Sequence, residues 1–449
     1  MLTRNLAGIA QAADYSMGGT TVKCPLFRLA ALLLPLLFLA ACAADDDDDA
    51  AADDDVTDDD AVDDDDTAAD DDDDTGDDDD DATPYDDSEL VAFIEQTMAA
   101  THIPGLAAGI VKDGSLIWSK NFGWAHIQQQ RPVADDTIFM LASVSKTVTA
   151  VALMQVWEDG YFELDDNVND YLDFTVENPQ HAGEPLTFRQ LLTHTSSIRD
   201  NWLVMVPLYV QGDSPLPLGG FLEDYLVPGG DYYHAALNYY RYTPGVEWNY
   251  SNMGITLAAY LVEALTGAAF DQYCNDNIFD ALGMTDTSWF LAGLDESKIA
   301  MPYEYLPALD SYRPYGQYGF PDYPDGQLRT TLKQLAKFQL AFIGDGEWDG
   351  RRILEAATVE EMRRQQVPDI EPTQGLVWYY TSQLGDETVL LGHNGGDDGV
   401  ATEMFFRVSD DLGFILLMNT DWTTEIYYQV MEIEKRLLAA GEEIPNGVF

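Results

Sequence analysis

The chain has 449 residues, of which 46% are hydrophobic and 23% charged, and its formal net charge at pH 7 is −58. So acidic a surface repels the phosphate backbone, which excludes nucleic-acid binding as a function. Three cysteines are too few for a disulfide-rich fold. The chain is long enough to bury a large core without disulfides.

The N-terminus has the pattern of an export signal. Lys23 and Arg28 precede thirteen residues, 29–41, that are apolar apart from Pro35. This run is too short to cross a bilayer and is typical of the apolar region of a signal peptide. We therefore expect residues 1–41 to be a signal peptide, with Met1 or Met17 as the true start.

The end of this run reads Leu39-Ala40-Ala41-Cys42 and resembles the lipobox of bacterial lipoproteins, in which the cysteine is lipidated and becomes the mature N-terminus. The resemblance implies a lipid anchor at Cys42 and a location in the cell envelope, on the membrane. An ordinary signal peptide with an incidental cysteine is the alternative.

An aspartate-rich segment follows, with 25 Asp among the 37 residues 45–81. Low hydrophobicity and like-charge repulsion predict a disordered linker over residues 42–87. The segment contains no EF-hand loop, so we expect no specific metal site. Residues 88–449 then form one domain, and residues 85–449 keep a formal charge of about −35.

The domain begins with a predicted helix and hairpin. Leu90, Ile94 and Met98, with Val91 and Phe93, give residues 88–100 an amphipathic pattern. The short apolar runs 106–111 and 116–122 are predicted strands, joined by a tight turn at residues 113–114, Asp-Gly.

The rest of the chain is mostly helical until strands return near its end. Helices are predicted over residues 143–160, 187–194 and 254–267, strands over 388–391, 401–407 and 413–418, and a closing helix over 423–439. The predicted fold class is α/β (α+β). Its antiparallel sheet is built from N- and C-terminal segments, flanked by terminal helices, with an inserted helical subdomain. A site is expected in the cleft between subdomains.

Ser143 and Lys146 are the first candidate catalytic pair. At the start of a helix, residues i and i+3 share one face, so the lysine amine can accept the serine proton. Free N–H groups at the helix start favour a developing oxyanion. By itself the pattern favours a capping serine and a solvated lysine, so other features must decide.

Two further segments supply candidate site residues. Tyr250-Ser251-Asn252 directly precedes a predicted helix, where Tyr250 can exchange a proton at the edge of a cleft. The segment His393-Asn394-Gly395-Gly396 follows a predicted strand. There the backbone N–H of Gly396 can complete an oxyanion hole with that of Ser143.

The order and spacing of these motifs resemble the serine β-lactamase-like family, over residues 89–420. That family includes class C β-lactamases, D-alanyl-D-alanine carboxypeptidases, D-aminopeptidases and related esterases. Four further segments carry the resemblance: Ile103-Pro104-Gly105-Leu106, Leu191-Leu192-Thr193-His194-Thr195-Ser196, Leu282-Gly283-Met284 and Gly392-His393-Asn394-Gly395-Gly396.

The resemblance implies a β-lactamase/transpeptidase-like fold and a hydrolase that works through an acyl-enzyme, without metal or organic cofactor. Ser143 would attack the carbonyl, and Lys146 and Tyr250 would share its proton. Asn252 would hold Lys146 and the substrate, while His393, Gly395 and Gly396 would line the substrate and oxyanion site. The substrate is expected to be a small ester, an amide or a peptide.

Departures from the family pattern restrict the substrate class that we expect. His393 stands where many members have the lysine of Lys-Thr-Gly, and Asp397 and Asp398 add negative charge unless they face solvent. We therefore expect an esterase or amidase. A D,D-carboxypeptidase acting on peptidoglycan, a β-lactamase, and a non-catalytic binding protein remain the alternatives. His194 is expected to cap carbonyl groups at a helix end, and Cys274 to have no disulfide partner.

Overall fold

The computed structural model describes residues 85–385 and 387–445. The signal peptide at 1–41, the lipidated Cys42 and almost all of the linker at 42–87 lie outside the described residues. These three assignments stay predictions.

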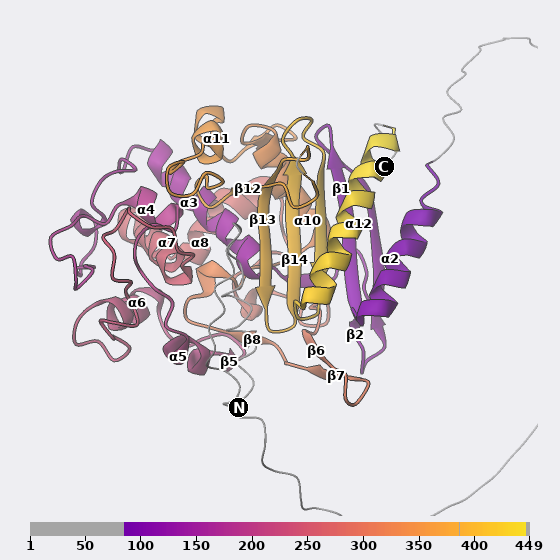
Figure 1. Ribbon diagram of the computed structural model, residues 1–449, viewed down its shortest axis with the longest axis horizontal. Helices are drawn as coiled ribbons and strands as arrows, with labels where there is room; N and C mark the ends of the chain where they lie inside the picture. Colours follow the sequence, from indigo (N-terminus) through magenta and orange to yellow (C-terminus); the bar gives the residue numbers. More distant parts are fainter. Residues whose placement is uncertain (1–84, 386, 446–449) are drawn as a thin grey trace, which may run out of the picture. The chain divides into compact units, whose positions relative to one another are not determined.

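The domain is built on a seven-stranded antiparallel sheet with the strand order β12-β13-β14-β15-β1-β2-β3 (Figure 1). The N-terminal hairpin lies beside the C-terminal strand, because Leu106 of β1 pairs with Met418 of β15. The predicted sheet from the two ends of the domain is therefore confirmed. Its strands are β1 (Gly105–Lys112), β2 (Ser115–His126), β3 (Arg131–Pro132), β12 (Tyr379–Thr381), β13 (Leu390–Asp397), β14 (Val400–Arg407) and β15 (Gly413–Met418).

Smaller strand pairs lie outside this sheet among the described residues. They are β4 (Ile138–Met140) with β9 (Arg329–Thr331), β5 (Val210–Gln211) with β8 (Tyr318–Gly319), β6 (Tyr303–Leu306) with β7 (Ser311–Pro314), and β10 (Glu347–Trp348) with β11 (Arg351–Arg352).

The predicted turn between β1 and β2 is present. Asp113 has φ of 48° and Gly114 has φ of 78°. Two successive positive φ angles give the turn the twist that two antiparallel strands require, and aspartate and glycine adopt them readily.

The two terminal helices cover one face of the sheet. Figure 1 shows α2 (Ser88–Thr101) and α12 (Thr424–Glu443) beside each other in front of β1 and β2. Leu90, Ile94 and Met98 of α2 are buried here with Phe405 of β14 and Leu437 of α12. The predicted amphipathic faces therefore form this half of the core.

The opposite face of the sheet carries the mostly helical part of the domain. Its helices are α3 (Ser145–Glu158), α4 (Phe188–Leu192), α5 (Trp202–Met205), α6 (Leu218–Leu226), α7 (Asn252–Thr266), α8 (Phe270–Cys274), α9 (Asp280–Leu282), α10 (Leu332–Ile343) and α11 (Ala356–Arg363). In the described part of the chain, no single helix is long and apolar enough to cross a membrane. The bent pair Asn252–Thr266 and Phe270–Leu282 passes that test only in combination.

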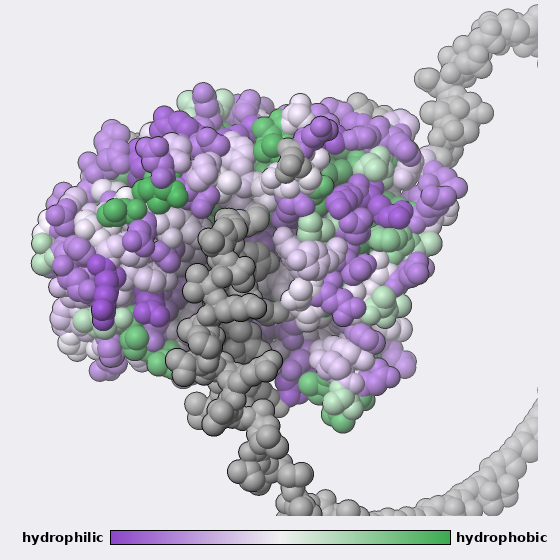
Figure 2. Space-filling model, in the orientation of Figure 1, coloured by the Kyte–Doolittle hydropathy of each residue, from purple (hydrophilic) through white to green (hydrophobic). Residues whose placement is uncertain are grey.

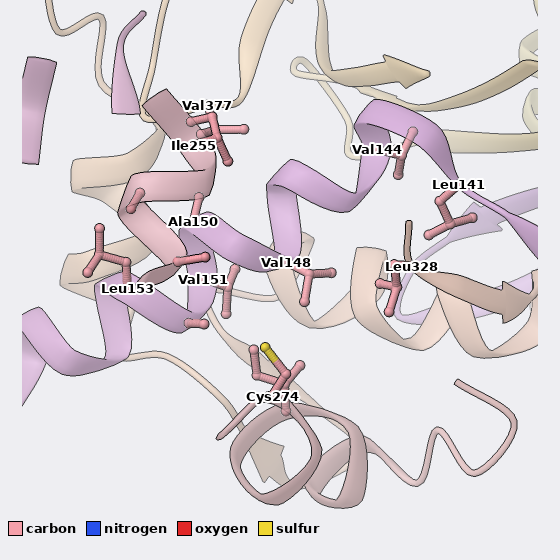
Figure 3. Packing of buried hydrophobic residues seen from close by; sticks show 14 of the residues in the cluster. Leu141, Val144, Val148, Ala150, Val151, Leu153, Ile255, Cys274, Leu328 and Val377 are labelled. Atoms are coloured by element: carbon pink, nitrogen blue, oxygen red, sulfur yellow. The ribbon is translucent and has the colours of Figure 1, made fainter. Parts of the chain in front are cut away.

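Helix α3 runs through the centre of the helical part. Figure 3 shows Val148, Val151 and Leu153 packed among apolar side chains that include Ile255 of α7 and Cys274 of α8. Cys274 is buried and free, as expected. Because a close-packed interior resists displacement, residues at the start of α3 sit on a rigid support.

The visible surface of the domain is mostly polar. Figure 2 shows hydrophilic side chains over most of this face, with hydrophobic ones in small separate groups. Scattered apolar residues of this kind are normal on a folded domain and indicate no interface by themselves.

Two glutamates are buried together between the sheet and α12. Glu403 of β14 is 1% exposed and Glu434 of α12 is 0% exposed. Burial raises the pKa of both carboxyl groups, to about 8 for Glu434, and their proximity raises that of Glu403 further. Gln383 donates a hydrogen bond to Glu434 at 3.0 Å. At neutral pH the pair therefore retains a proton that it would lose in the unfolded chain.

This pair makes folding stability depend on pH. A carboxyl group whose pKa is higher in the folded state contributes to the free energy of unfolding. This contribution is complete below the unfolded pKa, near 4.5, and is lost as the pH rises through the folded pKa, about 8 for Glu434. At pH 9 we expect Glu434→Gln to be more stable than wild type by about 1–3 kcal/mol in free energy of unfolding, and so to unfold at a higher temperature. At pH 4.5 we expect little difference between the two proteins. Thermal melts across this range would test it, with exposed Glu432→Gln as control; a gap independent of pH would contradict the assignment.

Candidate active site

Ser143 lies in a strained turn immediately before α3. It belongs to the 3-10 turn Ala142–Val144, not to the first turn of the α-helix as the sequence suggested. Ala142 has φ of 46°, an unfavourable angle for a residue with a Cβ atom. Leu141 holds the turn on both sides, because its N–H donates to Leu328 O at 2.8 Å and its carbonyl accepts from Thr402 Oγ1 at 2.7 Å. The fold thus fixes the position of the Ser143 hydroxyl.

Lys146 contacts Ser143 directly. Its Nζ donates to Ser143 Oγ at 2.9 Å and to the backbone oxygen of Asp325 at 2.6 Å. The lysine side chain is fully buried, and the Asp325 carboxylate lies 4.0 Å from Nζ. The structure therefore brings the predicted pair together and excludes a solvated lysine.

Opposing effects set the pKa of Lys146. Burial by itself lowers it, but the Tyr250 phenol where it ionises and the carboxylates of Asp325 and Asp200 outweigh burial and raise the pKa above its ordinary value. Lys146 is thus an ammonium group in the resting site, and it needs a neighbour that takes up a proton before it can act as a base.

Tyr250 completes this group from the loop before α7. Lys146 Nζ lies 5.0 Å from the centre of its ring. The buried hydroxyl makes no hydrogen bond of normal geometry with a described residue, although Ser143 and Lys146 lie near enough to affect it. Burial raises the pKa of Tyr250, while Lys146 and Ser143 lower it. The phenol is therefore neutral in the resting site, and it passes its proton on only while it takes another from a neighbour.

His194 positions the Tyr250 loop. Its ring lies 4.4 Å from that of Tyr250. Its Nδ1 accepts from Ser251 N at 3.2 Å, and its carbonyl accepts from Asn249 N at 2.9 Å. The expectation that this side chain caps carbonyl groups is wrong, because it accepts a backbone N–H. Burial and the charge of Lys146 hold the pKa of His194 well below its usual range, so the ring stays neutral.

Asn252 is held by Asp200. Its Nδ2 donates to Asp200 Oδ2 at 2.9 Å, and the N–H groups of Asn252 and Met253 donate to the same carboxylate at 3.0 and 3.1 Å. The expected hydrogen bond from Asn252 to Lys146 is absent among the described residues. The carboxylate at the positive end of α7 is the stronger acceptor and orients the amide. Asp200 was missed in the sequence because it lies 52 positions from Asn252 and no local pattern marks it.

The motif at 393–396 lies within β13, where it borders the Ser143 turn. Strand β12 pairs only with Leu390, Leu391 and Gly392, so the second half of β13 is free to face this turn. A Cβ on Gly395 would come within 2.3 Å of Leu141 O and 2.9 Å of Ser143 N. Only glycine permits this approach. Gly396 faces the other side of the sheet against Trp422, and the role of its N–H in an oxyanion hole stays a prediction.

His393 is buried on the face of β13 that Gly395 also occupies. Its Nδ1 lies 2.6 Å from the carbonyl of Asn394, which can only accept, so Nδ1 carries the proton and Nε2 does not. Burial, followed by the charge of Lys146, lowers the pKa of His393 to about 3. The residue that replaces the usual lysine is therefore uncharged. Asn394 lies on the opposite face, opposite Glu403.

Two aspartates that the sequence did not single out face each other beside Lys146. Asp322 and Asp325 interact through their carboxyl groups, and each is at least nine-tenths buried. Burial and mutual repulsion raise the pKa of Asp325, and burial raises that of Asp322 to about 6. Two neighbouring carboxyl groups that repel each other do not ionise together readily, so the pair holds a proton to a higher pH than a single aspartate does. The pair sits in the turn at Tyr323–Asp325, 179 positions from Lys146.

Asp397 faces the site, whereas Asp398 is exposed. Asp397 Oδ2 accepts from Tyr209 at 3.3 Å, and Oδ1 accepts from the N–H of Asp398 at 2.7 Å. Burial, followed by the charge of Asp398, raises the pKa of Asp397 to about 7. The predicted negative charge is present at this position only in part at neutral pH.

A family model described as "Beta-lactamase" matches residues 90–426. Among curated proteins, Protein flp of Staphylococcus aureus (strain NCTC 8325 / PS 47) is 25% identical over 257 residues, which cover 56% of this chain. That match spans about half, 48%, of the staphylococcal protein. Penicillin-binding protein 4* of Bacillus subtilis (strain 168) is 25% identical over 337 residues, covering 72% of this chain and 70% of that protein.

Among solved structures, the octameric penicillin-binding protein homologue from Pyrococcus abyssi superposes with a TM-score of 0.62. It is 24% identical and covers 80% of each chain. The expected fold is therefore confirmed.

Substitution of Asp322 and of Asp325 should shift the pH dependence of Ser143 reactivity in opposite directions. If neutral Lys146 is the base for Ser143, Asp325→Asn removes a negative charge, lowers the pKa of Lys146, and moves the rise of Ser143 reactivity to lower pH by about one unit. Asp322→Asn leaves Asp325 without its proton-sharing partner and more ionised, so the rise should move to higher pH. The measurement is the rate of fluorophosphonate labelling between pH 5 and 10. Shifts in the same direction would show that the pair does not set the charge of Lys146.

Proposed function

The chain belongs to the beta-lactamase family, and on that premise we propose that it is a serine hydrolase that cleaves an ester or amide through an acyl-enzyme on Ser143. The observation that carries the proposal is the 2.9 Å contact between the buried Lys146 amine and the partly buried Ser143 hydroxyl. Burying an ammonium group is costly, and a protein that only binds a ligand has no need of one beside a serine. A non-catalytic role is therefore disfavoured.

The first step forms an ester between Ser143 and the substrate acyl group. Lys146 first gives a proton to the Asp325 carboxylate, which lies 4.0 Å from its Nζ, and so becomes a neutral amine. Ser143 Oγ then attacks the carbonyl carbon, its proton passes to the Lys146 and Tyr250 pair, and the pair returns a proton to the leaving group. We assign the base role to the pair because both groups adjoin the hydroxyl. The Ser143 N–H, close to Gly395, is one donor to the oxyanion, and Gly396 N–H is the proposed second.

The second step releases the acyl group. Water attacks the ester carbonyl, the pair accepts its proton, and Ser143 leaves as a hydroxyl. His393 adds a hydrogen-bond acceptor to this site, because its Nε2 is buried, unprotonated and without a partner among the described residues. No step requires a metal or an organic cofactor.

A D,D-peptidase acting on peptidoglycan is the second candidate. It is favoured by the match to a Bacillus subtilis penicillin-binding protein over 72% of this chain. The cell-envelope location predicted from Cys42 would suit this role. The uncharged His393 and the partial charge on Asp397 disfavour it, because such substrates end in a carboxylate.

Replacement of the nucleophile tests the acyl-enzyme. We expect Ser143→Ala to fold like wild type, since it only shortens a partly buried side chain, and to lose at least about 10⁴-fold in kcat, as removal of a catalytic serine does elsewhere. Intact-mass spectrometry should show a fluorophosphonate or penicillin adduct on wild type alone. Ser145→Ala, two residues away, is the matched control. An adduct on Ser143→Ala would refute the assignment.

Substrate charge tests the environment of β13. Asp397 lies on the site face, so neutral p-nitrophenyl esters should be preferred over nitrocefin and D-Ala-D-Ala peptides in kcat/KM. The preference should grow by about tenfold as Asp397 ionises between pH 6 and 8.

Asp397→Asn should remove this growth with pH, whereas Asp398→Asn, which lowers the pKa of Asp397, should move it to lower pH. The measurement is kcat/KM for both substrate classes across this range. The electrostatic argument fails if wild type prefers nitrocefin or D-Ala-D-Ala peptides to the neutral esters throughout, or if Asp397→Asn leaves the profile unchanged.

A further inference from the structure

A cleft of about 460 Å³ opens beside the Tyr250 loop. Five of its lining residues come from the tyrosine-rich segment 232–242. Its walls include two arginines, three tyrosines, an asparagine and a glutamate. The lining residues that matter below are Arg199, Tyr240, Arg241, Tyr242, Glu247 and Asn249.

The cleft adjoins the candidate active site along two segments of the chain. Asn249 is followed directly by Tyr250, whose ring lies 5.0 Å from Lys146 Nζ. Arg199 is followed by Asp200, which binds the start of α7 at Asn252. Successive Cα atoms are about 3.8 Å apart, so Arg199 and Asn249 of the cleft each lie one residue from a residue of the candidate site.

The cleft contains two arginines without an ion pair to the residues that the structure describes, although the domain as a whole is strongly acidic. Residues 85–449 carry a formal charge of about −35, and within the described residues most lysines and arginines bind a carboxylate or a backbone carbonyl. Neither Arg199 nor Arg241 forms an ion pair with a described carboxylate. Glu247 lines the cleft as well, but no contact of 4.0 Å or less joins it to either guanidinium among these residues.

The aromatic walls hold one of these guanidinium groups in place. Arg199 lies over the ring of Tyr240 at 5.4 Å, and the rings of Tyr240 and Tyr242 stack at 5.2 Å. A guanidinium that rests on an aromatic face is oriented while its N–H edges remain able to bind an anion in a forked geometry. The stacked rings offer a flat apolar wall for the chain that carries this anion.

We propose that this cleft is a substrate subsite for an anionic group, a carboxylate carried on an apolar or aromatic linker and held by Arg199 and Arg241. The inference rests on the proposed function and names its substrate class. Asp397 and the Asp322–Asp325 pair repel negative charge next to Ser143, whereas the two arginines attract it farther away. The site therefore selects esters or amides that are neutral around the scissile bond and anionic at a distance.

Matched pairs of esters test this selection. On the acyl side, p-nitrophenyl hydrogen adipate is compared with p-nitrophenyl hexanoate; on the leaving-group side, 4-acetoxybenzoate is compared with phenyl acetate. We expect the distal carboxylate to raise kcat/KM in at least one pair at low ionic strength, and the gain to shrink at 0.5 M salt. Arg199→Gln and Arg241→Gln should each reduce this gain by about fivefold, the size expected for one partly exposed ion pair.

The variants are chosen to keep the fold. Arg199 is tied to its neighbours through its backbone, since its N–H donates to Asn238 O and its carbonyl accepts from Tyr225. Both bonds survive a change of side chain. Arg199→Lys and Arg241→Lys retain the charge and should keep part of the gain. Arg351→Gln on β11, an exposed arginine without an ion pair to a described residue, is the control for total charge.

A binding measurement separates this inference from the proposed function. The ligands are 4-phenylbutyrate and the neutral 4-phenylbutan-1-ol, titrated calorimetrically into Ser143→Ala protein. Tighter binding of the acid, lost in Arg199→Gln and Arg241→Gln, supports the subsite even if no ester is hydrolysed. If neutral esters are hydrolysed while neither the kinetics nor the binding responds to the arginines, the subsite is refuted and the hydrolase assignment stands.

Discussion

The buried ammonium group of Lys146 is the constraint on which the rest of the site depends. An isolated charge in a protein interior costs several kcal/mol unless hydrogen bonds and opposite charges compensate for it. Here the compensation comes from Ser143 Oγ, the backbone and carboxyl group of Asp325, and Tyr250. These partners belong to three separate loops, so the need to solvate one lysine fixes the relative positions of the nucleophile, its base and the opposite wall.

The sheet contributes chemistry through its backbone as well as stability through its packing. Its outer face buries α2 and α12, while the second half of β13 runs beside the Ser143 turn. The approach is possible because Gly395 has no side chain and because Thr402 on the next strand binds Leu141. The strain at Ala142 persists because these contacts determine the turn from both sides.

The titratable side chains around Lys146 carry less charge at neutral pH than exposed groups of the same type. His393 is neutral, Asp397 has a pKa of about 7, and the pKa values of Asp322 and Asp325 are raised. In a domain with so large an acidic excess, the raised pKa values of these groups reduce the negative charge next to Lys146. It also ties the electrostatics of the site to pH near neutrality, because the groups that change charge there are carboxyl groups and not histidines.

The sequence by itself determined the fold class, the hairpin at Asp113-Gly114, the amphipathic terminal helices, and Ser143, Lys146, Tyr250 and His393 as candidates. These features are encoded locally, by hydrophobic periodicity, turn residues and short motifs, and they could be predicted residue by residue. The start of α3 two residues after Ser143 was missed because backbone strain at Ala142 has no sequence signature.

Only the tertiary structure decided which groups surround the nucleophile. Asp200 was paired with Asn252, Asp325 was placed under Lys146, and Arg199 and Arg241 were gathered beside the Tyr250 loop. It also decided the charge states, since burial sets the pKa of His393 and Asp397. The physical reason is the same in each case: long-range packing determines burial and proximity, and both depend on residues that lie far apart along the chain.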